Sequence, residues 1–260
     1  PVPMIKLLYY LYSRHLSRGV RRYPVPRHVG IILDGNRRYA RSQKLADPVE
    51  AYQLGAQKLD DILVWCGEVG IPMVTLWVFS TENLSRPPEQ LSGLLAVVEA
   101  KLSQIAQDQR IHRRRVRVRA VGKLELLPDS TLAAIRQAEV ATAGYNGLHL
   151  TIAVAYGGRQ EIADAVRGLI LDKAKQGEGI QEIAEGITQE EIGRYLYAAD
   201  LPDPDLIIRT SGEIRLSGFL LWQSAYSEFY FCDVHWPAFR KIDFLRAIRA
   251  YQQRQRRFGA

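Results

Sequence analysis

The chain has 260 residues, of which 47% are hydrophobic, so it can bury the core of one large domain. No apolar run approaches the length of a membrane span, and the N-terminus does not resemble a signal peptide. The formal net charge of +7 favours anionic partners: phosphorylated metabolites, nucleic acid or acidic lipid. The two cysteines, Cys66 and Cys232, lie in apolar settings without metal-ligand spacing, which predicts reduced thiols in a cytoplasmic protein.

The first segment, Met4–Arg18, has the apolar spacing of an amphipathic helix, and we expect Gly19 to end it. Two interpretations stay open: a helix packed on the domain surface, or a peripheral contact with a membrane. We therefore treat residues 1–26 as an N-terminal helix with a linker and residues 27–260 as a single main domain.

The apolar run Val29–Leu33 predicts a strand buried on both faces, and a cluster of polar residues follows it directly. Gly35 lets a ligand approach the backbone, while Arg37 and Arg38 suit phosphate oxygens. Asp34 would repel a bound phosphate unless a cation lay between them, and Mg²⁺ typically binds one or two carboxylates together with phosphate oxygens. This stretch therefore predicts a diphosphate–Mg²⁺ site; the alternative is a solvated basic turn.

Strands and helices alternate along the rest of the chain, which indicates an α/β domain with a mostly parallel sheet flanked by helices. We expect further strands at Met73–Phe79, Arg115–Val121 (near one edge), Leu148–Ala155, Asp205–Thr210 and Phe229–Cys232. We expect helices near residues 49–68, 89–107, 132–143, 161–175, 189–196 and 244–257.

Polar groups follow four of these strands, at residues 34–38, 80–83, 157–159 and 209–213. In a parallel sheet these four strand ends share one edge, where ligands bind. One crevice would then collect five arginines: Arg37, Arg38, Arg86, Arg209 and Arg215. Such a set calls for a polyanion, which two diphosphates would supply. No Walker loop and no GxGxxG motif follows the first strand, so nucleotide-dependent chemistry is not indicated.

Several long motifs resemble the cis-prenyltransferases, the undecaprenyl-diphosphate-synthase-like enzymes. The matching stretches are HVGIILDGNRRYAR, FSTENLSRP, AYGGRQEI, DLIIRTSGEIRLSGFLLWQSAYSEFYF, WPAF and the closing RRFG, which together span residues 28–259. The resemblance implies a homodimer whose subunits have a six-stranded, mostly parallel sheet and a hydrophobic product tunnel. It also implies Mg²⁺-dependent condensation of an allylic diphosphate with isopentenyl diphosphate.

The resemblance assigns roles to individual residues. Asp34 would be the essential acid and, with Glu228, the Mg²⁺ site, while Asn83 would lie at the reacting centre; the proton acceptor would be Asp34 or the diphosphate. Substrate binding would involve Gly35, Asn36, Arg37, Arg38, Tyr39, Ser80, Thr81, Glu82, Leu84, Arg86, Arg209, Arg215, Leu216 and Ser217. The tail around Arg257 and Gly259 would reach the neighbouring subunit's site.

The chain departs from the family pattern at several positions. Pro48 and Tyr52 stand near the places of a usual arginine and histidine, and Tyr39 and Leu84 replace tryptophans. Val78 stands where long-chain enzymes usually have alanine, so a larger side chain would stop elongation sooner. The pattern is closest to short-chain Z-isoprenyl diphosphate synthases, which favours a Z,E-farnesyl-like product.

Three competing interpretations remain. The first is a long-chain synthase of the undecaprenyl or decaprenyl type for carrier lipid. The second is a non-catalytic partner subunit, which should lack Asp34, Asn83 or the paired arginines, although this chain has them all. The third, a nucleic-acid binder, is disfavoured because the basic run His112–Arg119 alternates with valine and lacks stacking aromatic residues.

Overall fold

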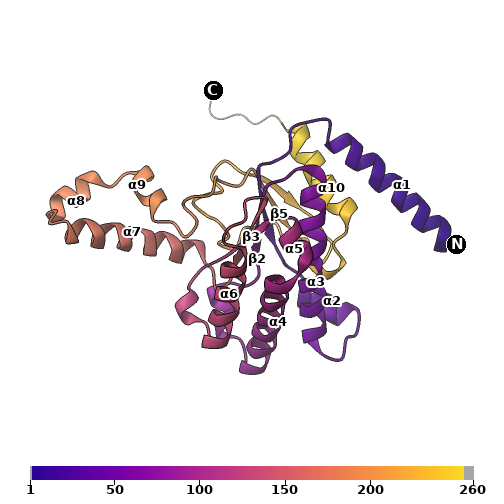
Figure 1. Cartoon of the computed structure of the whole chain (residues 1–260), viewed down its shortest axis with the longest axis horizontal. Helices are drawn as coiled ribbons and strands as arrows, with labels where there is room; N and C mark the ends of the chain where they lie inside the picture. The colour runs from indigo at the N-terminus through magenta and orange to yellow at the C-terminus, as the bar shows by residue number, and fades with distance from the viewer. Residues whose placement is uncertain (1, 255–260) are drawn as a thin grey trace.

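The structure, a computed structural model, describes residues 2–254, with side chains from Lys6 onward. Its centre is one six-stranded sheet of order β3-β4-β2-β1-β5-β6, in which every neighbouring pair is parallel. Figure 1 shows this sheet in the middle of the molecule, among the helices. Helices flank the sheet, as the alternation of strands and helices predicts. Parallel strands need long crossover connections, and helices supply most of them.

The strands match the expected segments, and all but the Arg/Val strand end one or two residues earlier than expected. They are β1 (His28–Ile32), β2 (Met73–Trp77), β3 (Val116–Val121), β4 (Leu148–Ala153), β5 (Leu206–Arg209) and β6 (Glu228–Phe231). The edge position predicted for the Arg/Val strand is confirmed, since β3 is the first strand of the sheet. Leu33, Val78 and Phe79, which follow β1 and β2, leave the sheet and line the functional site.

The helices include three short ones that the apolar spacing does not predict: α2, α5 and α8. The α-helices are α1 (Val2–Val20), α2 (Asn36–Ser42), α3 (Pro48–Val69), α4 (Pro88–Gln107), α5 (Gln109–Arg113), α6 (Asp129–Thr142), α7 (Gly158–Lys175), α8 (Ile180–Gly186), α9 (Gln189–Arg194) and α10 (Lys241–Gln253). The 3₁₀ turns are η1 (Thr81–Ser85), η2 (Leu124–Leu126) and η3 (Trp236–Ala238).

The sheet separates two hydrophobic clusters, because successive side chains of a strand point to opposite faces. On β5, Leu206 and Ile208 belong to the larger cluster, which also contains the apolar faces of α3, α4, α6 and α10. Ile207 belongs to the smaller cluster, which includes Phe219 and Trp77. These two rings stack at 5.4 Å between centroids, so the segment after β5 is anchored on the sheet's second face.

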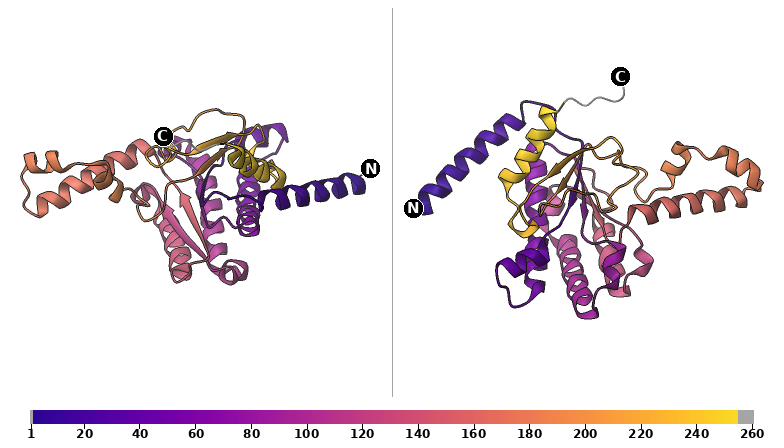
Figure 2. Two further views of the ribbon diagram at one scale, coloured as in Figure 1. Left: turned by 90° about the horizontal axis from the view of Figure 1, so that it is seen from above. Right: turned by 180° about the vertical axis from the view of Figure 1, so that it is seen from behind.

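Two parts extend from opposite sides of the body: α1 on one side, and α7 with α8 and α9 on the other (Figure 2). The prediction that Gly19 ends the first helix is wrong, because α1 continues to Val20. Burial of Leu16 and Val20 in the main core accounts for this extra length. None of the described helices is both long and apolar enough to cross a bilayer. The predicted tail contact of Arg257 and Gly259 lies outside the described residues.

Candidate active site

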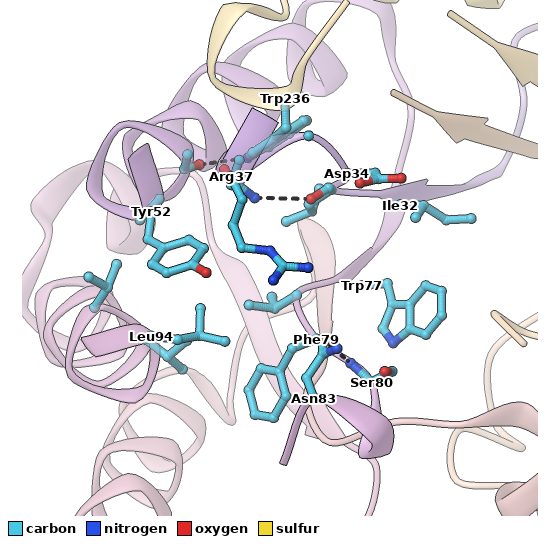
Figure 3. Close-up of a pocket in the computed structure, with 18 of the residues that line it drawn as sticks. Ile32, Asp34, Arg37, Tyr52, Trp77, Phe79, Ser80, Asn83, Leu94 and Trp236 are labelled. Carbon is cyan, nitrogen blue, oxygen red and sulfur yellow. Dashed lines mark hydrogen bonds between the residues drawn. The ribbon is translucent and has the colours of Figure 1, made fainter. Parts of the chain in front are cut away.

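A cavity of about 660 Å³ lies between the main-core face of the sheet and helices α3 and α4. Its mouth is at the carboxyl edge of the sheet, where the turns after β1, β2 and β5 meet. Figure 3 shows residues of the first two turns, among them Asp34 and Ser80. The five arginines expected in one crevice all line it: Arg37, Arg38, Arg86, Arg209 and Arg215. The sequence prediction of a shared, strongly basic crevice is therefore confirmed.

The turn after β1 depends on Gly35. Its φ of +104° is one that side-chain-bearing residues rarely adopt, and a Cβ there would lie 2.8 Å from Nδ1 of His235 and 2.9 Å from Cβ of Ser211. This turn directs Asp34 to the mouth and starts α2, whose residues Arg37 and Arg38 then face the cavity. A second close approach follows, since a Cβ on Gly55 of α3 would lie 2.7 Å from Oδ1 of Asn36.

Asp34 is held by two arginines. Oδ2 of Asp34 accepts hydrogen bonds from Nη2 of Arg209 at 2.8 Å and from Nη2 of Arg38 at 3.2 Å. Burial alone would raise the pKa of the Asp34 carboxyl, but hydrogen bonds from Arg209 and Ser211 and the charge of Arg38 hold that pKa below its usual range. Asp34 is therefore an ionised carboxylate at neutral pH.

Arg209 is the buried anchor of the site. Only 5% of its surface is exposed, and its Nη1 donates to the backbone oxygen of Arg215 and, at 2.8 Å, to Oγ of Ser217. These bonds fix the loop after β5 against the end of β1. Glu213 in the same loop accepts hydrogen bonds from both Arg38 and Arg215, so much of the positive charge here is already balanced.

Arg37 and Arg86 are different, because neither guanidinium pairs with an acid within residues 6–254. Figure 3 shows the Arg37 guanidinium directed into the cavity, toward Asn83. Burial lowers the pKa of Arg86, Tyr52 acts in the opposite direction, and the charge of Arg37 lowers it further. Two like charges that face a cavity without a counter-ion define a binding site for an anion.

The segment after β2 forms the opposite wall of the mouth. Ser80 precedes the 3₁₀ turn η1, and its backbone N–H donates to Oδ1 of Asn83 at 3.1 Å (Figure 3). This bond fixes the Asn83 side chain with its amide group at the cavity. Arg86 follows at the end of η1.

The segment that follows β4 supports the site without lining it. The residues after β4 lie at the shared edge, where Tyr156 forms a parallel bridge with Ser80, but Gly157 and Gly158 do not line the cavity. Instead, the backbone N–H of Gly158 donates to the oxygen of Gly218 at 2.8 Å, and a Cβ on Gly158 would lie 2.5 Å from that oxygen. The β4 turn thus supports the loop that carries Ser217.

The structure brings most of the expected residues together. Those that line the cavity are Asp34, Gly35, Asn36, Arg37, Arg38, Val78, Ser80, Asn83, Arg86, Arg209, Arg215 and Ser217. Neighbouring positions that lie outside the lining are Tyr39, Thr81, Glu82, Leu84 and Leu216. Leu84 and Leu216 pack instead against the two hydrophobic clusters.

Glu228 is the exception. It begins β6, where it pairs with Leu206 of β5, and Leu206 in turn pairs with Val29 near the start of β1. Asp34, by contrast, lies beyond the carboxyl end of β1. The part of β1 from Val29 to its last residue, Ile32, is already about 10 Å long, so Glu228 and Asp34 are at opposite edges of the sheet. Oε2 of Glu228 accepts a hydrogen bond from Nη1 of Arg254 at 2.7 Å, which supplies the partner that its partial burial requires. The predicted Mg²⁺ site shared by Asp34 and Glu228 therefore does not form within one chain.

The apolar spacing gave no direct indication of several further lining residues. Tyr52 of α3 is 7% exposed, and its hydroxyl has no hydrogen-bond partner within the described residues (Figure 3). Trp236 of η3 lines the same end and donates from Nε1 to the oxygen of Gly55 at 2.9 Å. The only available signal for Tyr52 was its position near a usual family histidine.

Beyond the mouth the cavity is apolar. Its walls are formed by one face of α4 and by facing residues of α3 and β4, namely Leu59, Leu94, Val97, Val98, Leu102 and Ile152. A cationic mouth on an apolar pocket fits an amphiphile with an anionic head group. The fold and the site therefore define an enzyme class that binds phosphorylated hydrocarbons.

Comparison with known proteins agrees with this class. Residues 32–259 match the prenyltransferase family described as "Putative undecaprenyl diphosphate synthase". An isoprenyl transferase of Thermus thermophilus is 56% identical over 252 residues, covering 97% of this chain and 95% of the relative. A (2Z,6E)-farnesyl diphosphate synthase of Thermobifida fusca is 54% identical over 252 residues, covering 97% of each chain.

Relatives named for long products are equally similar. A tritrans,polycis-undecaprenyl-diphosphate synthase of Methanopyrus kandleri is 54% identical over 255 residues, covering 98% of this chain and 92% of the relative. Among solved structures, lavandulyl diphosphate synthase from Lavandula x intermedia, in complex with dimethylallyl diphosphate, has a TM-score of 0.82 and 32% identity, covering 91% of this chain and 99% of that one. The chain belongs to the cis-prenyltransferase family and is a prenyl-transferring enzyme.

Proposed function

We propose that this enzyme condenses an allylic diphosphate with isopentenyl diphosphate to give a Z-prenyl diphosphate. The observation that carries the proposal is the pair Arg37 and Arg86, which lack acidic partners and face the mouth of an apolar cavity. A diphosphate supplies the missing negative charge, and its hydrocarbon tail occupies the apolar walls.

The reaction follows from these positions. The allylic C–O bond breaks, and its electron pair leaves with the diphosphate, whose charge the arginines stabilise. The double bond of isopentenyl diphosphate attacks the allylic carbon, a C–C bond forms, and a proton leaves the adduct. Hydrogen bonds hold the pKa of Asp34 low, which makes it a weak base, so the departing diphosphate is the better proton acceptor. Asn83 orients the reactants.

We propose Mg²⁺ as the cofactor, with Asp34 as its protein ligand. Within the described part of the chain, no group of three or more His, Cys, Asp or Glu side chains is arranged to hold a metal. A single carboxylate beside a diphosphate site fits Mg²⁺, which is usually bound by one or two carboxylates and substrate phosphates. When bound, the ion neutralises the developing charge of the leaving group.

We propose a short product of the Z,E-farnesyl kind, supported by Val78 in the cavity lining. A long-chain product is the alternative, because relatives named for both products are equally similar. A valine at this position, which lies two residues before Ser80 of the mouth, leaves less room in the cavity than an alanine would. Val78→Ala is therefore expected to lengthen the product.

We further propose a cytoplasmic homodimer with a peripheral membrane contact through α1. Support for pairing comes from β6, an edge strand whose residues are all partly exposed. Support for the membrane contact comes from Leu7, Leu8 and Leu11, each more than half exposed. Light scattering and sedimentation with anionic vesicles test the two points.

Product analysis tests the function. The purified protein receives Mg²⁺, labelled isopentenyl diphosphate and, separately, dimethylallyl, geranyl or farnesyl diphosphate, and the products are sized after removal of the phosphates. A labelled Z-product that disappears with a chelator and in Arg37→Ala supports the proposal. No condensation with any starter, from a folded protein, overturns it and favours a non-catalytic partner subunit.

A further inference from the structure

The deep part of the cavity contains one charged side chain that the site described above does not use. Among the described lining residues, the other charged groups lie at the end of β5 or in the segments that follow β1, η1 and β5, at or near the mouth, whereas Lys101 lies on α4. It shares a helix face with Leu94, Val97 and Val98, the residues that form the apolar wall. A cation on this face interrupts an otherwise apolar surface.

Lys101 is fixed in place. Only 7% of its surface is exposed, and its Nζ donates to Oδ1 of Asp60 at 2.6 Å and to Oε1 of Gln104 at 3.1 Å. Asp60 also accepts a hydrogen bond at 3.2 Å from Nη2 of Arg110. These bonds connect α3, α4 and α5, so the ammonium group cannot move aside without loss of buried contacts.

The position of Lys101 along α4 places it away from the mouth. The helix begins at Pro88, two residues after Arg86, and ends at Gln107, from where α5 leads to the amino end of β3 at the opposite edge of the sheet. Lys101 lies seven residues after Leu94, which is about 10 Å further along the helix axis. An extended isoprene unit has four backbone bonds and is about 4–5 Å long. Each added isoprene unit thus advances the end of the tail by roughly half of the distance between Leu94 and Lys101.

A hydrocarbon tail that reaches Lys101 meets an unfavourable surface. Asp60 and Gln104 already bind this ammonium group, so contact with the tail would remove only the remaining hydration of the ion pair, and this further desolvation is unfavourable. An apolar side chain of the same length would instead continue the favourable wall. The charge of Lys101 therefore opposes further elongation of the hydrocarbon tail, in addition to the limit that the size of the cavity sets.

We propose that Lys101, held by Asp60, ends the apolar part of the cavity and limits the length of the prenyl product. This inference rests on the proposed condensation reaction. It concerns specificity only: Lys101 touches the end of the tail and not the reacting atoms.

The test compares products of wild type, Lys101→Met and Lys101→Arg, with isopentenyl diphosphate and geranyl diphosphate as substrates. Methionine keeps the length of the side chain and removes its charge, and Asp60 retains Arg110 as a partner. We expect the longest major product of Lys101→Met to grow by about one or two isoprene units. Lys101→Arg keeps the charge and should keep the wild-type length.

Lys58→Met is the matched control. Lys58 lies on α3, pairs with Asp61 at 2.8 Å and does not line the cavity, so this change should leave the product length unaltered. If Lys101→Met does not fold, Lys101→Gln, which keeps an N–H donor for Asp60, should show the same lengthening.

The outcomes are distinct. Longer products from the uncharged variants alone support the proposal. An unchanged or shorter product from a folded, active Lys101→Met enzyme overturns it, as does the same lengthening in Lys101→Arg. Absence of any condensation by the wild-type enzyme overturns the proposed function itself, which total incorporation of the label reports independently of chain length.

Discussion

Arg37 and Arg86 approach each other at the cavity mouth without an acidic partner, so that the charge of Arg37 lowers the pKa of Arg86. The nearby Arg38 and Arg215, by contrast, share Glu213. Uncompensated repulsion between partly buried groups opposes folding, which is typical of residues that serve a ligand.

Arg86→Ala should therefore weaken substrate binding without loss of stability. A charged hydrogen bond contributes about 1.5–3 kcal/mol, so KM for the diphosphate substrate should rise about 10- to 100-fold. The midpoint of thermal unfolding should stay unchanged or rise, because the repulsion with Arg37 is relieved. Arg117→Ala, on the exposed face of the edge strand β3, is the control and should alter neither quantity. A large fall in the unfolding midpoint at unchanged KM would show that Arg86 is structural.

The sequence predicts the strand-end part of this site well. An apolar run followed by a polar cluster locates the end of β1, and the parallel arrangement then brings the ends of β1, β2 and β5 together. Arg209 could be assigned to the crevice for this reason alone.

The remaining features depend on packing that the chain order does not encode. Glu228 belongs to the expected last strand, but it begins that strand and so lies at the opposite edge from Asp34. Tyr52 and Lys101 lie on helices, where the direction of a side chain depends on how α3 and α4 pack against the sheet. Gly19 shows the same limit, since core burial of Val20 outweighs the usual helix-ending tendency of glycine.

Gly35→Ala should reduce both stability and activity. The positive φ alone costs a side-chain-bearing residue about 1–2 kcal/mol, and the added methyl group would displace His235 or Ser211. A displacement of about 1 Å at the reacting groups can lower the rate about 100-fold. Urea unfolding and steady-state kinetics measure the two effects.

Gly70→Ala separates the two causes. Gly70 also has a positive φ, +83°, but a Cβ there meets nothing within 4 Å. This variant should lose about 1–2 kcal/mol of unfolding free energy and keep full activity. Equal losses of activity in both variants would contradict the role given to the close contacts of Gly35.

Tyr52→Phe should reduce substrate binding and leave the fold intact. The Tyr52 hydroxyl is buried at the cavity without a hydrogen-bond partner in the described structure, so its removal costs no internal bond. If the hydroxyl donates to a diphosphate oxygen, KM for the allylic substrate should rise about tenfold or more. Tyr145→Phe is the control, because its hydroxyl bonds Nδ1 of His112 at 3.0 Å far from the cavity. That variant should lose about 1 kcal/mol of stability at unchanged KM.

His28 should make the protein less stable as the pH falls below 6.5. Burial lowers the pKa of the His28 imidazole, an effect only partly offset by Pro202 and Asp205. Nδ1 lies 2.7 Å from the oxygen of Pro202 and Nε2 lies 2.8 Å from Oγ1 of Thr75, an arrangement that suits the neutral ring. Below pH 6.5 the unfolded chain binds a proton that the folded protein does not. The free energy of unfolding should therefore fall by up to about 1.4 kcal/mol per pH unit.

Urea unfolding between pH 7 and pH 5 measures this slope in the wild type and in His28→Gln, where it should be clearly smaller. His149→Gln is the matched control: burial and two nearby arginines, Arg117 and Arg119, lower the pKa of His149, but this histidine is less buried than His28. Its removal should flatten the slope less. Equal slopes in wild type and His28→Gln would mean that His28 takes up its proton in the folded protein as readily as in the unfolded chain.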